Sequence, residues 1–282
     1  MSYLLADQLS EIDRLRLQSC VWEPAGERLL ASLGVGSGQH VLEVGCGVMG
    51  WLGCLSRWVG EYGVVIGTDI ANNLLDAARL FCVESHLANV TLLQDDFFAT
   101  QLEEASFDLV HLRFQLCPIG RVPEQMAIAS RLLKPGGRLI LEDPDAGSWH
   151  ENPVSAAAQR LRELILEAFI RGGGDFSSGR RLPEYLRSIG MEPQMRVECL
   201  ALDAGHPYLH LPVQFATSLK PRLLQLVDET ELTRLMEQAA SDLESAHRWG
   251  TTFTLVQAWG RKEAAKAAAV EDLQPGSPKE GT

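Results

Sequence analysis

Residues 40–50, HVLEVGCGVMG, place a short apolar run directly before three closely spaced glycines. The run is β-branched and apolar enough to predict a buried strand, and the glycines predict a tight turn into a following helix. Glycines in such a turn let the backbone approach a ligand, because no Cβ stands in the way. A strand, glycine turn and helix in this order favour an α/β fold over an all-α or all-β one.

The alternation of strand and helix continues along the chain. The predicted strands cover residues 40–44, 63–69, 89–96, 107–113 and 133–143, and the predicted helices between them cover 51–59, 71–86 and 123–133. Strands that alternate with helices at this spacing predict a parallel sheet covered by helices on both faces.

After residue 145 the pattern changes. We predict a helix at 153–171, a flexible Gly/Ser-rich hinge at 171–181, a short helix at 181–191, a strand at 192–202, a long helical block at 213–248 and a strand at 251–262. We therefore expect a single domain over 1–262. Its core covers about 34–145, 182–202 and 251–262, and its helical cap covers 1–33, 146–181 and 203–250. Residues 263–282 are expected to be a disordered tail.

Composition narrows the class of protein. The chain has 282 residues, of which 46% are hydrophobic, but no apolar run of membrane-spanning length. Its start does not resemble a signal peptide, and its six cysteines form no C-x-x-C pair, so we expect reduced thiols, no zinc site and a cytoplasmic location. A net charge of -12 disfavours nucleic acid as a partner. The sequence leaves open whether the protein forms a homodimer.

Polar residues follow four consecutive predicted strands, where open parallel sheets bind their ligands. The glycine turn follows the first strand, Asp69 ends the second, Asp96 follows the third and His111 lies near the end of the fourth. Asp69 suits two ribose hydroxyls and Asp96 suits an adenine amine. Phe97 or Ile70 can pack against the adenine ring. These features predict a ligand that contains adenosine.

Glu43 separates two adenosine cofactors. Gly45, Gly47 and Gly50 match the dinucleotide motif G-x-G-x-x-G, with Asp69 about 20 residues further on. A carboxylate at position 43 would repel the pyrophosphate of NAD, whereas the sulfonium and ammonium of S-adenosylmethionine suit a nearby acid. The simpler alternative is that Glu43 caps backbone amides of its own loop. An NAD(P)-dependent oxidoreductase is the less favoured interpretation.

The segments VLEVGCG, VVIGTD, LLQDDF, FDLVHLRF and LLKPGGRLILED together resemble the class I S-adenosylmethionine-dependent methyltransferases over residues 40–143. The resemblance implies a Rossmann-like, seven-stranded, mostly parallel sheet whose antiparallel last strand is 251–262, and S-adenosyl-L-methionine as cofactor. Met49 departs from the family pattern, which has a glycine there. The residues predicted to bind the cofactor are Glu43, Gly45, Cys46, Gly47, Asp69, Ile70, Asp96, Phe97 and His111.

Three residues are candidates for catalysis: His111, Asp143 and His206. Each has a simpler structural alternative, as a buried core histidine, a solvated loop acid and a substrate contact, respectively. His206 and His210 have an H-x-x-x-H spacing, but nearby prolines argue against a helix that would align them. We expect no metal.

The function expected from these features is methyl transfer to a small, partly apolar metabolite, because a helical cap encloses a small molecule better than it binds a large surface. The sequence does not specify whether oxygen, nitrogen or carbon is methylated. One alternative is a protein of the same fold that binds S-adenosylmethionine and catalyses a rearrangement without methyl transfer. A protein methyltransferase is a further, weaker alternative.

Overall fold

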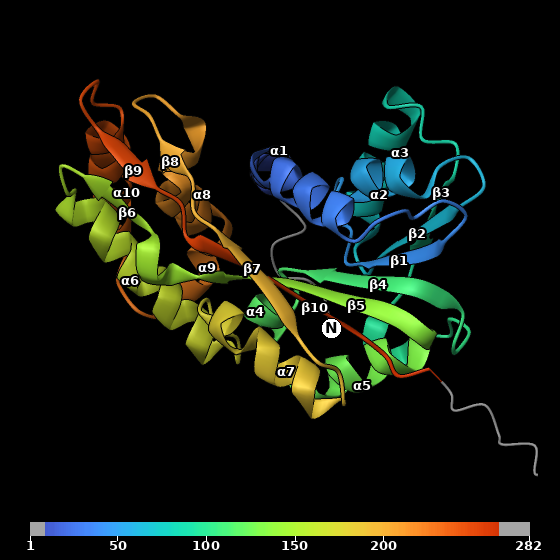
Figure 1. Cartoon of the computed structure of the whole chain (residues 1–282). Helices are drawn as coiled ribbons and strands as arrows, with labels where there is room; N and C mark the ends of the chain where they lie inside the picture. Colours follow the sequence, from blue (N-terminus) through green and yellow to red (C-terminus); the bar gives the residue numbers. More distant parts are fainter. Residues whose placement is uncertain (1–8, 265–282) are drawn as a thin grey trace, which may run out of the picture.

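A twisted sheet of seven strands runs through the centre of the molecule (Figure 1). The computed structural model describes residues 9–264, so most of the predicted tail, from residue 265 on, lies outside the described residues. The strand order is β3-β2-β1-β4-β5-β10-β7. The bounds are β1 His40–Val44, β2 Val64–Asp69, β3 Val90–Gln94, β4 Phe107–Arg113, β5 Leu133–Asp145, β7 Gln194–Glu198 and β10 Thr254–Arg261.

Strands β1 to β5 pair in parallel, and β10 runs antiparallel to both of its neighbours, β5 and β7. This confirms the predicted Rossmann-like fold, including its antiparallel last strand. The strand order reverses at β1, because the chain first adds β2 and β3 on one side and then β4 and β5 on the other. The carboxyl ends of β1 and β4 therefore form the edge where a ligand is expected.

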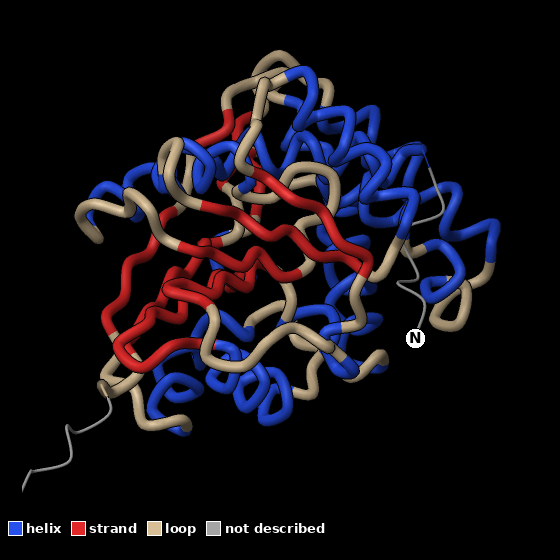
Figure 2. Tube along the Cα trace, turned by 90° about the vertical axis from the view of Figure 1, so that its right-hand side faces the viewer, coloured by secondary structure: helices blue, strands red, loops and turns tan. Residues whose placement is uncertain are grey.

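Helices cover both faces of the sheet (Figure 2). On one face, α5 (Val122–Leu132) and α7 (Leu182–Ser188) pack in a cluster that includes Leu42. On the other, α2 (Leu52–Val59) and α3 (Asn72–Glu84) pack in a cluster that includes Val41. Successive residues of a strand point to opposite faces, so an unbroken apolar run such as that of β1 suits a sheet buried on both sides.

Helix α1 (Leu9–Ser32) joins the sheet domain to the cap. Its residues Trp22 and Ala25 belong to the apolar cluster of the cap, whereas Leu29 and Leu30 belong to the cluster that covers the sheet. The helix continues through Pro24. Part of the predicted cap segment 1–33 therefore packs directly on the core.

The cap lies beyond one end of the main sheet (Figure 1). It combines helices with a small antiparallel sheet of order β6-β9-β8. The bounds are α6 Ala156–Arg171, α8 Leu211–Ser218, α9 Lys220–Leu223, α10 Glu229–Leu243, β6 His150–Asn152, β8 Ala201–Leu202 and β9 Trp249–Thr251. Short helical turns are α4 Leu116–Ile119, η1 Phe97–Ala99, η2 Ala146–Ser148, η3 Ser178–Arg181 and η4 Pro207–His210.

Three predictions for this half were wrong in detail. The helical block at 213–248 is divided among α8, α9 and α10, with a proline in the first turn of both α8 and α9. The strand at 192–202 is two strands, β7 and β8, which belong to different sheets. Within the segment at 251–262, Thr254–Arg261 form the antiparallel strand β10 as predicted, whereas Thr251 belongs to β9 of the small sheet, which was not predicted.

The Gly/Ser-rich segment at 171–181 is packed rather than a free hinge. Phe176 in its middle is only 4% exposed, and the backbone N–H of Asp175 donates to the carbonyl of Cys117 at 2.8 Å. A Cβ on Gly174 would lie 2.2 Å from that same carbonyl oxygen. The glycines therefore permit close packing against α4, which the composition of the segment did not reveal.

Among the described residues, no helix combines the length and apolar character that crossing a membrane requires.

Candidate functional site

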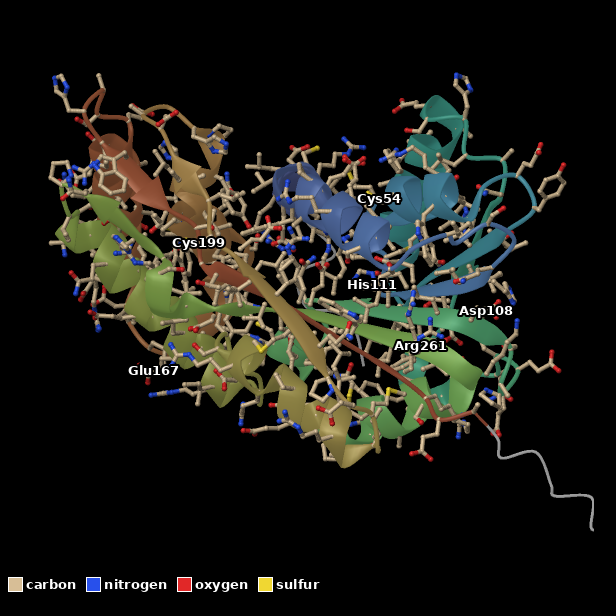
Figure 3. The ribbon with its side chains drawn as sticks, in the orientation of Figure 1. Cys54, Asp108, His111, Glu167, Cys199 and Arg261 are labelled. Carbon is tan, nitrogen blue, oxygen red and sulfur yellow. The ribbon has the colours of Figure 1, made fainter. Side chains whose placement is uncertain are left out.

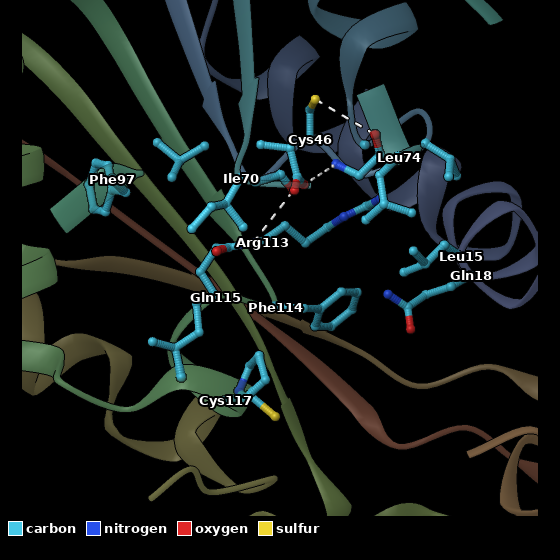
Figure 4. A pocket seen from close by; sticks show the side chains of 18 of the residues that line it. Leu15, Gln18, Cys46, Ile70, Leu74, Phe97, Arg113, Phe114, Gln115 and Cys117 are labelled. Atoms are coloured by element: carbon cyan, nitrogen blue, oxygen red, sulfur yellow. Dashed lines mark hydrogen bonds between the residues drawn. The ribbon is translucent and has the colours of Figure 1, made fainter. Parts of the chain in front are cut away.

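A cavity of about 500 Å³ opens at the carboxyl ends of β1, β2 and β4, between the sheet and the cap (Figure 4). Its wall has two chemically different halves. One half consists of the glycine turn after β1 and the acidic ends of β2 and β3. The other half consists of α1 side chains and phenylalanine rings from the cap. The cavity is therefore enclosed on one side by the sheet edge at which the strand order reverses and on the other by the cap.

The glycine turn is fixed by Asp69. Gly45 and Gly47 have φ angles of +62° and +55°, which side chains with a Cβ rarely adopt. The Gly47 N–H donates to Asp69 Oδ2 at 3.0 Å, and the Ala71 N–H donates to Oδ1 at 2.9 Å. Burial raises the pKa of Asp69 despite these two amide donors. Asp69 thus orders the loop and still presents its carboxylate to the cavity.

Glu43 caps its own loop, as the simpler alternative proposed. Its Oε1 accepts from the Trp51 N–H at 3.1 Å, immediately before α2. A Cβ on Gly50 would lie 2.6 Å from the same oxygen. The glycine at position 50 is therefore required by the Glu43 carboxylate beside it. Glu43 also lines the cavity, so capping and a ligand contact are compatible. Met49 packs near Leu15 of α1.

His111 lies inside the sheet and does not line the cavity (Figure 3). It is fully buried, with Nδ1 2.5 Å from Glu43 Oε2 and Nε2 3.2 Å from Glu142 Oε2. Its ring stacks on Trp51 with centroids 3.9 Å apart. Burial lowers the pKa of His111, but the charges and hydrogen bonds of Glu43 and Glu142 outweigh it and raise the pKa to about 9.

Both ring nitrogens face carboxyl groups, and neither is free to meet an acceptor in the cavity. The structure therefore does not place His111 where a catalytic base or a cofactor contact was predicted. His111 is instead a buried positioning group that holds Glu43. The Glu142 carboxylate on its other side accepts from Gln257 Nε2 at 2.5 Å, so the network reaches from β1 to β10.

Asp143 and His206 also lie outside the described cavity wall. Asp143 is fully buried, its Oδ2 accepts from Ser178 Oγ at 2.9 Å, and burial raises its pKa well above the usual range. His206 Nδ1 accepts from the Tyr208 N–H at 3.1 Å and so begins η4. Each makes a structural hydrogen bond there, and the structure does not place either residue at the cavity, where a catalytic role was predicted.

The remaining predicted cofactor residues line the cavity together. They are Glu43, Gly45, Cys46, Gly47, Asp69, Ile70, Asp96 and Phe97. Asp96 Oδ1 accepts from the Phe98 N–H at 3.0 Å, which starts η1 and fixes Phe97 at the cavity wall. The geometry brings these residues to one side of one space, and their individual contacts with a cofactor stay predictions.

Phenylalanine rings from distant parts of the chain form the other half. Phe176 lies 5.2 Å from Phe169, 5.6 Å from Phe215 and 5.4 Å from Phe253, measured between ring centroids. Phe253 in turn lies 5.8 Å from Phe114. All five line the cavity. Edge contacts of this kind fix the rings in place and leave an apolar wall suited to a flat molecule.

The sequence did not identify several cavity residues. They include Arg14, Leu15, Gln18 and Ser19 of α1, and Arg113, Phe114, Gln115, Arg222 and Phe253. Among these, Arg113, Phe114 and Gln115 carried a signal, because they end or directly follow β4, where a ligand was expected. The α1 residues come from a helix that the sequence placed only in the cap, and Phe253 is brought in by tertiary packing alone.

One cluster of metal-type donors occurs among the described residues: Glu23, Glu27 and Cys54. The Arg57 guanidinium binds both carboxylates, at 3.0 and 2.7 Å. The cluster is therefore explained as an ion-pair network on the surface of α1 and α2 and supplies no evidence of a metal.

Comparison with known proteins agrees with the fold. Residues 41–137 match the family model described as a methyltransferase domain. A demethylmenaquinone methyltransferase of Staphylococcus saprophyticus is 33% identical over 117 residues, which make up 40% of this chain and 48% of that relative. The chain spans about half the length of the curated relatives it matches.

Two solved structures share the fold at low identity. A SAM dependent methyltransferase from Aquifex aeolicus has a TM-score of 0.51 and 21% identity, covering 69% of this chain and 91% of that one. The [4+2]-cyclase SpnF has a TM-score of 0.50 and 19% identity, covering 86% and 84%. The domain match spans β1 to the start of β5, the part of the chain that builds the glycine-turn half of the cavity. Residues 41–137 are accordingly similar to a methyltransferase domain, and the fold agrees with that of S-adenosylmethionine-dependent methyltransferases.

Proposed function

We propose that this chain transfers a methyl group from S-adenosylmethionine to a small, partly apolar metabolite. One observation carries the proposal: the glycine turn with Asp69 and the cluster of phenylalanine rings line the same cavity of about 500 Å³. A cofactor on the first half and an acceptor on the second would face each other in an enclosed space. Such juxtaposition is the main requirement of a direct displacement.

The cofactor half fits an adenosine ligand that carries positive charge. Gly45 and Gly47 expose backbone that a Cβ would cover, and the Asp69 oxygens keep lone pairs for two ribose hydroxyls beyond the loop amides. The carboxylates that line this half are Glu43, Asp69, Asp95 and Asp96. Bound S-adenosylmethionine supplies an electrophilic methyl group on a cationic sulfur. Four carboxylates favour that cation over the anionic pyrophosphate of NAD.

The acceptor half favours an aromatic metabolite. Its five phenylalanine rings offer an apolar wall, and Arg14, Arg113 and Arg222 are the charged residues there. A curated relative is named for methylating demethylmenaquinone. We correspondingly propose that the methyl acceptor of this chain is a small molecule. The cap and the net charge of -12 support it over a nucleic acid, and we propose that the protein acts in the cytoplasm.

The four carboxylates of the described cavity wall lie on its cofactor half, and its phenylalanine half contains no carboxylate, histidine, lysine or tyrosine. In this proposal the residues of the acceptor half bind and orient the acceptor and exclude water rather than remove a proton. The acceptor atom must reach the site already nucleophilic, as a phenolate, thiolate, amine or stabilised carbanion does. Orientation by a closely fitting wall supplies the rate enhancement in this proposal.

Isothermal titration tests the cofactor assignment. We expect S-adenosylhomocysteine to bind with a dissociation constant in the micromolar range and NADH to bind much more weakly. Binding of NADH with none of S-adenosylhomocysteine would contradict the proposal. A screen of aromatic acceptors with S-adenosylmethionine, read as S-adenosylhomocysteine formed, then tests methyl transfer.

A second candidate function is a rearrangement that needs bound S-adenosylmethionine without consuming it. The absence of a carboxylate, histidine, lysine or tyrosine from the phenylalanine half of the described cavity wall favours it, and a [4+2]-cyclase shares the fold. The same screen separates the two. Conversion of an acceptor with the cofactor recovered intact supports the rearrangement, and equal amounts of S-adenosylhomocysteine and methylated product support methyl transfer.

A further inference from the structure

Arg113 lines the cavity and has a buried donor group without a hydrogen-bond partner among the described residues. It ends β4 and is only 7% exposed. Its Nη2 donates to Ser19 Oγ at 3.0 Å, whereas Nη1 is buried and has no hydrogen-bond partner among the described residues. Leaving a buried charged donor unsatisfied is costly, so such a group points to a ligand.

The neighbouring acids are already engaged. Glu43 binds Trp51 and His111, and Asp69 binds the loop amides. The other buried arginine of the wall, Arg14, pairs with Glu11 at 2.5 Å. Arg113 has no ion pair with any described residue, although the chain as a whole is strongly acidic.

The position of Arg113 is at the junction of the two halves. Figure 4 shows its side chain beside Phe114 and on the side of Leu15 and Gln18 of α1. Two residues further along the chain, Gln115 Nε2 approaches the carbonyl of Gly45 at 3.4 Å, so this segment also borders the glycine turn. A ligand group at Arg113 would therefore lie between the cofactor half and the phenylalanine rings.

The chemistry of the site selects a carboxylate. A guanidinium is permanently charged and its planar fork matches two carboxylate oxygens. Ser19 accepts from Nη2 and so keeps its hydroxyl hydrogen for the same ligand. Together they present two donors, one charged and one neutral, at a buried point of the wall.

We infer that Arg113 and Ser19 form a carboxylate-binding site in this cavity. The inference rests on the proposed function, because it assumes that the cavity holds S-adenosylmethionine and an acceptor. Two ligands can bring the carboxylate: the amino-acid tail of the cofactor, or an acidic aromatic acceptor. Both would place a carboxylate at Arg113. The two possibilities can be distinguished with pairs of ligands in which only one member carries the carboxylate.

The first arm uses the cofactor. Isothermal titration compares S-adenosylhomocysteine with 5′-deoxy-5′-(3-aminopropylthio)adenosine, which lacks only the carboxylate. If the tail binds at the site, Arg113→Met weakens S-adenosylhomocysteine at least tenfold and leaves the second ligand within twofold. Arg113→Lys, which keeps the charge but not the fork, is expected to recover part of the loss.

The second arm uses probes for the acceptor half. Protein saturated with S-adenosylhomocysteine is titrated with 1-naphthoate and with 1-naphthamide, which have similar shape but differ in charge. If an acceptor carboxylate binds at the site, Arg113→Met weakens naphthoate at least tenfold without weakening naphthamide.

Arg248→Met is the matched control. Arg248 is also a buried arginine with one unpartnered nitrogen, and it donates to the carbonyl of Pro153 away from the described cavity wall. Arg248→Met should leave the affinities for all four ligands unchanged, and thermal unfolding of both Met variants checks that they fold. The site is refuted if Arg113→Met changes neither the affinity of S-adenosylhomocysteine relative to its carboxylate-free analogue nor the affinity of naphthoate relative to naphthamide. If the wild-type protein does not bind S-adenosylhomocysteine, the proposed function itself fails.

Discussion

At the scale of single residues, the Glu43 carboxylate is shared between the amide of Trp51 and the imidazole of His111. Glu142 lies on the other side of the ring, so the imidazole is held between two carboxyl groups beneath the glycine turn. The same network makes the stability of the fold depend on pH.

The raised pKa of His111 predicts lower stability in alkali. Protonated His111 stabilises the fold fully below the ordinary histidine pKa of 6.5, where both the folded and the unfolded protein are protonated. This stabilisation is lost as the pH rises through about 9, the pKa of His111 in the folded state. We expect the free energy of unfolding to fall by on the order of 3 kcal/mol over this window. Chemical unfolding of wild type and His111→Gln at several pH values measures it.

The titratable groups other than His111 are common to both proteins, so their effect cancels in the difference. A wild-type curve that parallels that of His111→Gln from pH 6 to pH 10 would show that His111 is not charged in the fold.

Asp69 was recognised from the sequence because it ends the next apolar strand after the glycine turn. Asp69→Ala removes an acceptor for the ribose, and we expect S-adenosylhomocysteine to bind about 1.5–3 kcal/mol more weakly. Burial raises the pKa of Asp69, so wild-type affinity should also decrease on acidification at a higher pH than an exposed aspartate would cause.

Titration calorimetry on both proteins checks this, with thermal unfolding as a control for the lost amide bonds to Gly47 and Ala71. Unchanged affinity in a folded Asp69→Ala variant would remove Asp69 from the cofactor site.

At the scale of elements, the loop between β1 and α2 uses its glycines for different purposes. Gly47 has open surroundings, where a Cβ would meet only Leu15 at 3.9 Å. At Gly50 a Cβ would lie 2.6 Å from Glu43 Oε1 and 2.9 Å from the Cys46 carbonyl oxygen. Both have positive φ angles, +55° and +42°. The first glycine serves the cavity, and the second serves the fold.

Alanine at the two positions should therefore act differently. Gly47→Ala costs about 1–2 kcal/mol of backbone strain, and its Cβ occupies surface that the cofactor would approach, so affinity for S-adenosylhomocysteine falls at least tenfold. Gly50→Ala adds the loss of a buried hydrogen bond to similar strain and destabilises by roughly 2–4 kcal/mol. Urea unfolding and calorimetry on both variants measure the contrast, and equal losses of stability would contradict it.

The sequence predicts features that neighbouring residues determine, and it does not reveal features that depend on contacts between distant residues. The strands from 40 to 143 were predicted almost to the residue, because buried parallel strands appear as unbroken apolar runs. The small sheet was missed, because strands of three residues or fewer such as Trp249–Thr251 have no measurable periodicity. Phe253 became a cavity residue only through tertiary packing. His111 was located correctly at the end of β4, but its role depends on Glu142 of β5, a partner that spacing along the chain does not reveal.

At the scale of the whole molecule, α1 and β10 connect the two halves. Trp22 packs with the cap while Leu29 packs with the sheet, and Leu255 of β10 also belongs to the cap cluster. The cavity lies between these halves, so each supplies half of its wall. We therefore propose, in line with the single domain expected from the sequence, that sheet and cap unfold together.

Differential scanning calorimetry tests this proposal. Shared apolar clusters make separate unfolding of the cap costly, so we expect one transition whose calorimetric and van't Hoff enthalpies agree. Because both halves line the cavity, S-adenosylhomocysteine at about 100 times its dissociation constant should stabilise that single transition by about 2.7 kcal/mol. Two transitions, of which the ligand shifts only one, would show that the cap is an independent unit and that the cofactor is bound by the sheet domain alone.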